Sequence, residues 1–161
     1  MQLSSGADVA LADLLVQLRR AGYAFVTPTP GTHARVVARA GKDVARNLRD
    51  IFGWSLPFDP ALWFVARHGE EIVGFCLGFR RNWKGAPDGY VSDLGVRPAR
   101  RGGGLGFALL TTVLAALAAR ELPTATLDTD ADNLTGALRL YRKAGMTATP
   151  LATEWTKPLA G

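Results

Sequence analysis

A basic, glycine-rich turn lies between two apolar stretches of the chain and has the composition of an anion-binding site. It spans residues 100–106, with the sequence Arg-Arg-Gly-Gly-Gly-Leu-Gly, and joins a strand-like segment at 89–96 to an apolar run at 107–119. The first amides of a helix lack intrahelical partners and carry partial positive charge. Glycines have no Cβ atom that would keep a ligand away from those amides. We therefore expect this turn to bind a phosphate or pyrophosphate group.

Two familiar phosphate-binding motifs do not fit this turn. The P-loop requires a Lys followed by Ser or Thr after its glycines, and neither pair follows here. The dinucleotide-binding pattern Gly-x-Gly-x-x-Gly fails because Phe107 occupies its third glycine position. The pattern that fits is Arg101-x-x-Gly104-x-Gly106 after a Val-Arg-Pro strand end. It resembles the acyl-CoA pyrophosphate loop of the GCN5-related N-acetyltransferases, the GNAT family.

A second motif near the C-terminus carries the same resemblance. Asn133 opens a predicted helix that contains Leu140-Tyr141 and is followed by Gly145 and Met146. It closely resembles the ending of the family, and the two motifs stand in the family's order and at its usual separation. Within the family, this ending also resembles a repeat of mycothiol synthase, an enzyme that carries two such domains.

The resemblance implies how the chain would bind acetyl-CoA. Main-chain amides of the turn would hold the pyrophosphate, and the end of strand 89–96 would hydrogen-bond the pantetheine arm, where a bulge near Gly95 would leave backbone groups unpaired. Asn133 would bond the pantetheine, although from the residues alone it equally fits a helix N-cap. The expected cofactor-binding residues are therefore Leu94, Gly95, Val96, Arg101, Gly102, Gly103, Gly104, Leu105, Gly106, Phe107 and Asn133.

Two side chains are candidates for the chemistry. The resemblance implies that Tyr141 lies near the thioester sulfur and protonates the departing thiolate, whereas outside the family context a Tyr on an apolar helix stripe is a core residue. Direct attack on the thioester needs a neutral amine, and Asp93 is the candidate base. Several family members have a carboxylate one position earlier, where this chain has Ser92, so in a regular pleat Asp93 points to the opposite face. Asp93 is either the base or a buried structural carboxylate.

The apolar periodicity and the turn formers predict, from residue 23 onward, the order β-αα-β-β-β-α-β-α-β-β. This order is the one that the family uses, so the resemblance implies the acyl-CoA N-acyltransferase fold. That fold is an α/β (α+β) architecture with a mixed, mostly antiparallel sheet of about six to seven strands and helices on both faces. The predicted strands are 23–27, 62–67, 72–80, 89–96, 124–129, 146–150 and 153–158, and the predicted helices are 7–20, 32–52 in two parts, 105–120 and 133–144.

Two connecting segments leave alternatives open, and a third has a single prediction. Residues 33–39 fit a strand paired with 23–27 as well as a helix. The aromatic segment 53–60 would either line a substrate pocket or cover the edge of the sheet. Residues 82–88 are predicted to be a loop. We expect residues 1–22 to form an N-terminal helical extension and 23–161 the acetyltransferase domain.

Composition limits the remaining hypotheses. The chain has 161 residues and a net charge of +5, and its longest apolar run is too short to span a bilayer. No signal peptide is evident, and one cysteine, Cys76, excludes an internal disulfide, fits a cytoplasmic protein and suggests a small core residue. Two histidines and one cysteine, spread far apart, predict no metal site.

We conclude from the sequence that the chain is an acetyl-CoA-dependent N-acetyltransferase acting on a primary amine of a small molecule or protein, without a membrane partner. One alternative is a non-catalytic acyl-CoA-binding or regulatory module. Another is a basic nucleic-acid-binding protein, for which residues 80–84 (Arg-Arg-Asn-Trp-Lys) are the only local hint. The family often pairs through sheet edges, so the resemblance makes a homodimer one possible assembly, and the sequence leaves the oligomeric state open.

Overall fold

The computed structural model describes residues 5–26, 59–83, 86–129, 136–148 and 154–159. These residues form a seven-stranded sheet in the order β1-β2-β3-β4-β5-β7-β6. The strands are β1 (Tyr23–Val26), β2 (Trp63–His68), β3 (Glu71–Trp83), β4 (Ala86–Val96), β5 (Thr124–Asp128), β6 (Thr147–Ala148) and β7 (Glu154–Pro158). The helices are α1 (Ser5–Arg20), α4 (Leu105–Ala118) and α5 (Ala137–Lys143), with short 3₁₀ turns η1 (Pro60–Leu62) and η2 (Pro98–Arg100).

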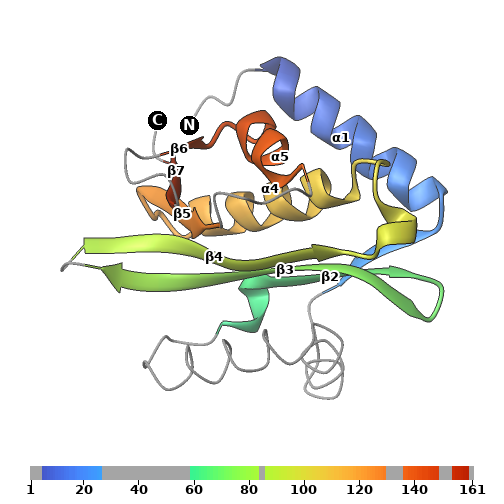
Figure 1. Cartoon of the computed structure of the whole chain (residues 1–161), viewed down its shortest axis with the longest axis horizontal. Helices are drawn as coiled ribbons and strands as arrows, with labels where there is room; N and C mark the ends of the chain where they lie inside the picture. The colour runs from blue at the N-terminus through green and yellow to red at the C-terminus, as the bar shows by residue number, and fades with distance from the viewer. Residues whose placement is uncertain (1–4, 27–58, 84–85, 130–135, 149–153, 160–161) are drawn as a thin grey trace.

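The sheet is mixed, as predicted. β4 and β5 are parallel, and each of the other neighbouring pairs is antiparallel. Helices α1, α4 and α5 lie on the same side of strands β2 to β4 (Figure 1). The helices predicted at 32–52, the alternative strand at 33–39 and the aromatic residues 53–58 lie outside the described residues.

Helix α4 packs unusually close to the sheet because three glycines lie beneath it. A Cβ atom built on Gly74, Gly78 or Gly89 would come within 2.7–2.9 Å of a side chain on Leu109, Val113 or Leu117, respectively. These three helix residues recur every four positions, so they form one stripe along α4. The contact fixes the height and direction of the helix and therefore places its N-terminus beside the end of β4.

Two predicted boundaries were wrong. The loop predicted at 82–88 is largely a continuation of the hairpin, since Asn82 pairs with Pro87 and Trp83 with Ala86. An ion pair between Arg81 Nη2 and Asp88 Oδ2, at 3.0 Å and mostly buried, holds the two strands together there. Because Arg81 is engaged in this pair and also donates to Thr126 Oγ1 at 2.7 Å, its charge is used inside the fold, which weakens the hint of nucleic-acid binding.

The last helix also begins later than predicted, at Ala137 instead of Asn133. Gly136 precedes it with φ 77°, a left-handed conformation that cannot be part of a right-handed helix. Its other end agrees with prediction, because Gly145 has φ 77° and its amide donates to the Arg142 carbonyl at 3.0 Å.

The packing of α4 on glycines can be tested with Gly78→Ala. The new Cβ would lie 2.7 Å from Val113 Cγ1 and 3.1 Å from the backbone oxygen of Leu62. We expect the free energy of unfolding, measured in urea, to fall by about 1–3 kcal/mol because the site is overpacked. Gly103→Ala, where nothing lies within 4 Å of the new Cβ, is the control and should stay within about 0.5 kcal/mol. Equal stability of the two variants would contradict the packing argument.

Candidate functional site

The glycine-rich turn presents unpaired amides at the start of α4. Gly102 and Gly104 have φ 86° and 85°, which residues with side chains rarely adopt. Gly104 is the N-cap, and the first helical bond runs from the Ala108 amide to its carbonyl at 3.0 Å. The amides of Leu105, Gly106 and Phe107 therefore have no intrahelical acceptor. The predicted anion-binding geometry is present.

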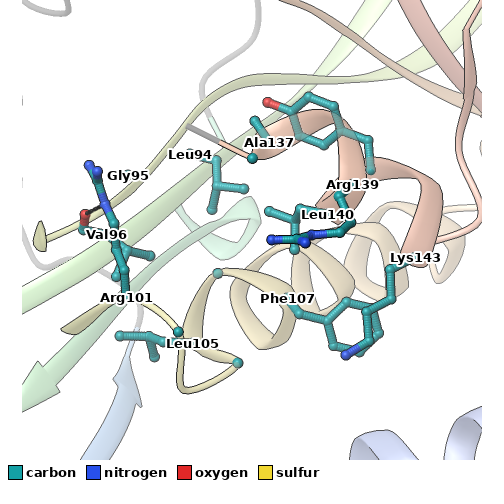
Figure 2. A pocket seen from close by; sticks show the side chains of 15 residues that line it. Leu94, Gly95, Val96, Arg101, Leu105, Phe107, Ala137, Arg139, Leu140 and Lys143 are labelled. Carbon is teal, nitrogen blue, oxygen red and sulfur yellow. Dashed lines mark hydrogen bonds between the residues drawn. The ribbon is translucent and has the colours of Figure 1, made fainter. Parts of the chain in front are cut away.

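A pocket of about 640 Å³ opens above these amides, between the end of β4, the start of α4 and α5. Figure 2 shows Arg101 on the β4 side of this pocket and Arg139 and Lys143 on the α5 side. We call it the α4 pocket. It is lined by Leu94, Gly95, Val96, Arg101, Gly102, Gly104, Leu105, Gly106, Phe107, Gly136, Ala137, Arg139, Leu140, Tyr141 and Lys143.

Most of the predicted cofactor residues are therefore brought together. Gly103 belongs to the same turn but does not line the α4 pocket, and Asn133 lies outside the described residues. Sequence reasoning missed the contribution of α5, from which Arg139, Leu140 and Lys143 join the lining. The sequence feature that could have identified them is the spacing of Arg139 and Lys143, which are four positions apart and hence lie on one face of the helix.

Positive charge surrounds the α4 pocket without being neutralised in the described part of the chain. Arg101 Nε donates to the Val96 carbonyl at 3.0 Å, which orients the guanidinium along the end of β4. Lys143 Nζ lies 4.6 Å from the centre of the Phe107 ring. Neither these cations nor Arg139 forms a salt bridge with a described acidic side chain. The rim suits a ligand that carries several phosphate groups.

Strands β4 and β5 part beside this pocket. They pair only at Gly89 with Ala125 and at Tyr90 with Thr126. Beyond Tyr90, no described strand pairs with this edge of β4. Apart from the Val96 carbonyl, which accepts from Arg101, this edge offers its backbone groups to a ligand that adds itself as a strand.

The bulge predicted near Gly95 lies instead at Ser92. Leu77 faces Asp93 and Gly78 faces Val91, so Ser92 is the extra residue of β4. Gly95 pairs regularly with Phe75, whose Cε1 would be 2.8 Å from a Cβ built on Gly95. The placement near Gly95 was therefore wrong, because the register shift falls between Val91 and Asp93; Gly95 instead makes room for an aromatic ring.

Asp93 faces away from α4. Residues opposite each other in an antiparallel pair share a face, and Asp93 is opposite Leu77 while the next β3 residue, Gly78, faces α4. The pleat is irregular at Ser92, so simple alternation along β4 does not apply there. The register still places Asp93 on the face that Phe75 occupies.

A second pocket, of about 730 Å³, lies where Asp93 and Phe75 face. We call it the β4 pocket. Its walls include Ile72 and Pro98, and Arg97 lies at its edge in an ion pair with Glu71. The two pockets share Leu94, Gly95, Val96 and Arg101. The free end of β4 is therefore a wall with one pocket on each side.

The Asp93 carboxyl is poorly solvated. Its Oδ2 atom is buried and has no hydrogen-bond partner among the residues that the structure describes. Burial raises the pKa of Asp93, and the neighbouring Ser92 hydroxyl offsets part of that rise. On the same face, Tyr90 donates to Asp128 Oδ2 at 3.2 Å, and burial raises the pKa of Tyr90 to about 12. A carboxyl with a raised pKa beside a pocket is suited to accept a proton.

Tyr141 is held rigidly at the base of the α4 pocket. Its side chain is buried, its ring centre is 5.7 Å from that of Trp155, and the Met146 amide donates to its carbonyl at 3.0 Å. Burial raises the pKa of the phenol, and a side-chain hydrogen bond with Thr129 opposes that rise. The phenol is therefore protonated at neutral pH and can act as an acid.

Two other chemistries have no support in the described part of the structure. Cys76 is buried, and burial raises the pKa of its thiol, so its predicted role as a small core residue is confirmed. No group of three or more His, Cys, Asp or Glu side chains lies together there in a way that could hold a metal ion. No described helix is long and apolar enough to cross a membrane.

Comparison with known proteins agrees with this site. The sequence pattern of the Acetyltransferase (GNAT) family matches residues 33–146, so the chain belongs to this family. The mycothiol acetyltransferase of Streptomyces scabiei (strain 87.22) is 48% identical over 92 residues, which cover 55% of this chain and 28% of that protein. The chain thus matches less than a third of this relative's length.

Solved structures share the fold. A GCN5-related N-acetyltransferase from Sphaerobacter thermophilus superposes with a TM-score of 0.63 and 31% identity, covering 87% of this chain and 46% of that one. A chain of the NatC complex bound to Gag peptide and CoA superposes with a TM-score of 0.60 at 14% identity, covering 86% and 99%. The predicted α/β fold and family are confirmed.

The environment of Asp93 predicts how stability changes with pH. Folding raises the pKa of this carboxyl, so the folded state favours its protonated form. The resulting contribution to the free energy of unfolding is fully present below the pKa of the unfolded chain, about 4, and is lost as pH rises through the pKa of the folded protein. Asp93→Asn removes this dependence. We expect the variant to gain stability over the wild type as pH increases from about 4 to 8, measured by urea unfolding. A difference that is constant with pH would show that Asp93 is not strained by burial.

Proposed function

We propose that this protein is an acetyl-CoA-dependent N-acetyltransferase that transfers an acetyl group to a primary amine of a small molecule or a protein. The observation that carries the proposal is the pair of pockets on either side of the free end of β4, which share Leu94, Gly95 and Val96. One pocket has the cations and amides for a polyphosphate ligand, and the other has a carboxylate for an amine. Family membership supports the same reaction.

In this proposal, acetyl-CoA occupies the α4 pocket. The amides of Leu105 to Phe107 and the charges of Arg101, Arg139 and Lys143 bind its phosphates. The unpaired edge of β4 near Leu94 to Val96 bonds its amide-containing arm. The related chain of the NatC complex, which was solved with CoA, supports this choice of cosubstrate.

The acceptor amine occupies the β4 pocket. Ile72, Phe75 and Pro98 give that pocket an apolar wall, so it fits an amine attached to an apolar or flat group. Asp93 accepts a proton from the ammonium, directly or through water, because the buried carboxylate gains from being neutralised. The neutral amine then attacks the thioester carbonyl beside the end of β4.

Tyr141 completes the reaction from the opposite side. It donates its phenolic proton to the thiolate as the carbon–sulfur bond breaks, and the raised pKa keeps that proton in place until then. Asp93 faces away from α4 and Tyr141 lines the α4 pocket. The end of β4 thus separates the base from the acid. This arrangement suits the reaction, because the amine loses a proton on one side and the thiolate gains a proton on the other.

The other hypotheses differ in what they predict. A non-catalytic module would bind acetyl-CoA and acetylate no amine. The name of the curated relatives, mycothiol acetyltransferase, makes mycothiol-related amines one acceptor class to include in a screen. The cytoplasmic location and the homodimer remain predictions.

The cosubstrate assignment is tested by placing a negative charge in the turn. Position 103 accepts a side chain without a clash, because nothing lies within 4 Å of a Cβ built there. Gly103→Glu should weaken acetyl-CoA binding by about tenfold or more through repulsion of the phosphates, measured by isothermal titration calorimetry. The uncharged isostere Gly103→Gln is the control and should remain within about threefold of the wild type. Absence of binding by the wild-type protein at millimolar acetyl-CoA would sink the acetyltransferase proposal.

The assigned acid and base are tested by steady-state kinetics on an amine panel. Tyr141→Phe should lower kcat by about 10²-fold while the KM for acetyl-CoA changes little, because only proton donation is lost. Asp93→Asn should lower kcat/KM for the amine by a similar factor. It should also abolish the rise of kcat/KM with pH that reflects ionisation of the carboxyl. Full activity in both variants would assign both residues to the structure alone.

A further inference from the structure

The N-terminal helix touches the glycine-rich turn at one point. A Cβ atom built on Gly104 would have three nearest neighbours, Leu14 Cδ1 at 2.9 Å, Cδ2 at 3.3 Å and Cγ at 3.7 Å. The isobutyl group of Leu14 thus covers the N-cap residue of α4. A Cβ on Gly102 or Gly103 would meet nothing within 4 Å, and one on Gly106 would meet Leu140 and Val96 but no residue of α1.

A second link joins the residue after α1 to the first residue of the turn, through a side chain of β2. His68 Nε2 lies 3.1 Å from the Ala21 carbonyl, just after α1, and its Nδ1 lies 3.4 Å from Arg100 Nη2. Imidazole with its proton on Nε2 donates to the carbonyl and accepts from the guanidinium, so one tautomer satisfies both contacts. Arg100 is the last residue of η2 and immediately precedes Arg101. The turn is therefore contacted at Gly104 by Leu14 of α1 and linked at Arg100, through His68, to the residue that follows α1.

These contacts are important for the order of the turn because of its composition. Three consecutive glycines have many accessible conformations, and fixing their backbone in one of them costs conformational entropy. If the rest of the protein did not restrict the turn, the turn would lose this entropy when a phosphate group binds, and the affinity would be lower. A hydrophobic group packed on Gly104 restricts it in advance, which favours ligand affinity without touching the ligand.

We infer that Leu14 is a positioning residue, which holds the phosphate-binding turn in its binding conformation from the side opposite the ligand. The inference rests on the proposed function for its effect on acetyl-CoA. It concerns helix α1, which lies outside the 33–146 match to the family.

Leu14→Ala tests the inference against a matched neighbour. Leu14 and Leu15 are both half-buried leucines that pack on the core, but only Leu14 covers Gly104. Leu14→Ala should raise the KM for acetyl-CoA about 3- to 10-fold, while kcat and the KM for the amine change by less than about twofold. Leu15→Ala should lower the melting temperature similarly and leave all three constants near wild type. Leu14→Met, which keeps an apolar chain of similar volume, should restore the KM.

The contact with Gly104 is tested by a double-mutant cycle. Gly104→Ala drives a methyl group into Leu14 and should weaken acetyl-CoA binding. Adding Leu14→Ala removes that clash, so the double variant should bind at least about threefold better than the product of the two single losses predicts. Strictly multiplicative losses, or equal KM changes in Leu14→Ala and Leu15→Ala, would overturn the inference.

A cofactor-free measurement separates this inference from the proposed function. Backbone ¹⁵N order parameters of Gly102 to Gly106 should decrease in Leu14→Ala and stay unchanged in Leu15→Ala. If they do not decrease, Leu14 does not hold the turn, whatever the protein binds. If the order parameters decrease but the wild type fails to bind acetyl-CoA, the proposed function is wrong, and Leu14 orders the turn for another anionic ligand.

Discussion

The site depends on the close contact between α4 and the sheet. Glycines at 74, 78 and 89 let the stripe Leu109, Val113 and Leu117 approach the backbone of β3 and β4. An α-helix is a rigid rod over this length, so fixing its middle against the sheet also fixes its first turn. The unpaired amides at that turn consequently stand beside the last residues of β4. Every later feature of the site uses this placement.

The parting of β4 from β5 turns this placement into a site with two sides. The strands pair at Gly89 and Tyr90 and do not pair beyond, and α5 contributes to the pocket at that point. The end of β4 is left with one free edge and with a pocket on each face. Burial acts on both candidate groups in the same way, since it disfavours ionised Asp93 and ionised Tyr141. For the carboxyl this strengthens the tendency to take up a proton, and for the phenol it preserves a proton that can be given away.

Much of this arrangement could be predicted from the sequence because its signals are local. The turn at 100–106 and the hairpin of β2 and β3 are specified by residues that are adjacent in the chain. The features that were missed depend on distant partners. The ion pair of Arg81 with Asp88, and the bond from Arg81 to Thr126, hold the extended hairpin of β3 and β4 together. The bulge at Ser92 is defined by the register of β4 against β3, and Phe75 of β3 occupies the space over Gly95. The charges of α5 were visible, but only the packing shows which face of that helix meets the α4 pocket.

The N-terminal helix contributes to a turn that lies far from it in the sequence. The family match begins at residue 33, yet α1 ends beside β1 and places Leu14 against the turn that lies about ninety positions later in the chain. A turn with three successive glycines gives a ligand open access to the backbone and, for the same reason, has little stiffness of its own. The stiffness has to come from packing, and in the described part of the chain the side chain that packs on Gly104 belongs to α1. The glycines thus give a ligand access to the backbone of the turn, and the helix on its other side keeps the turn ordered.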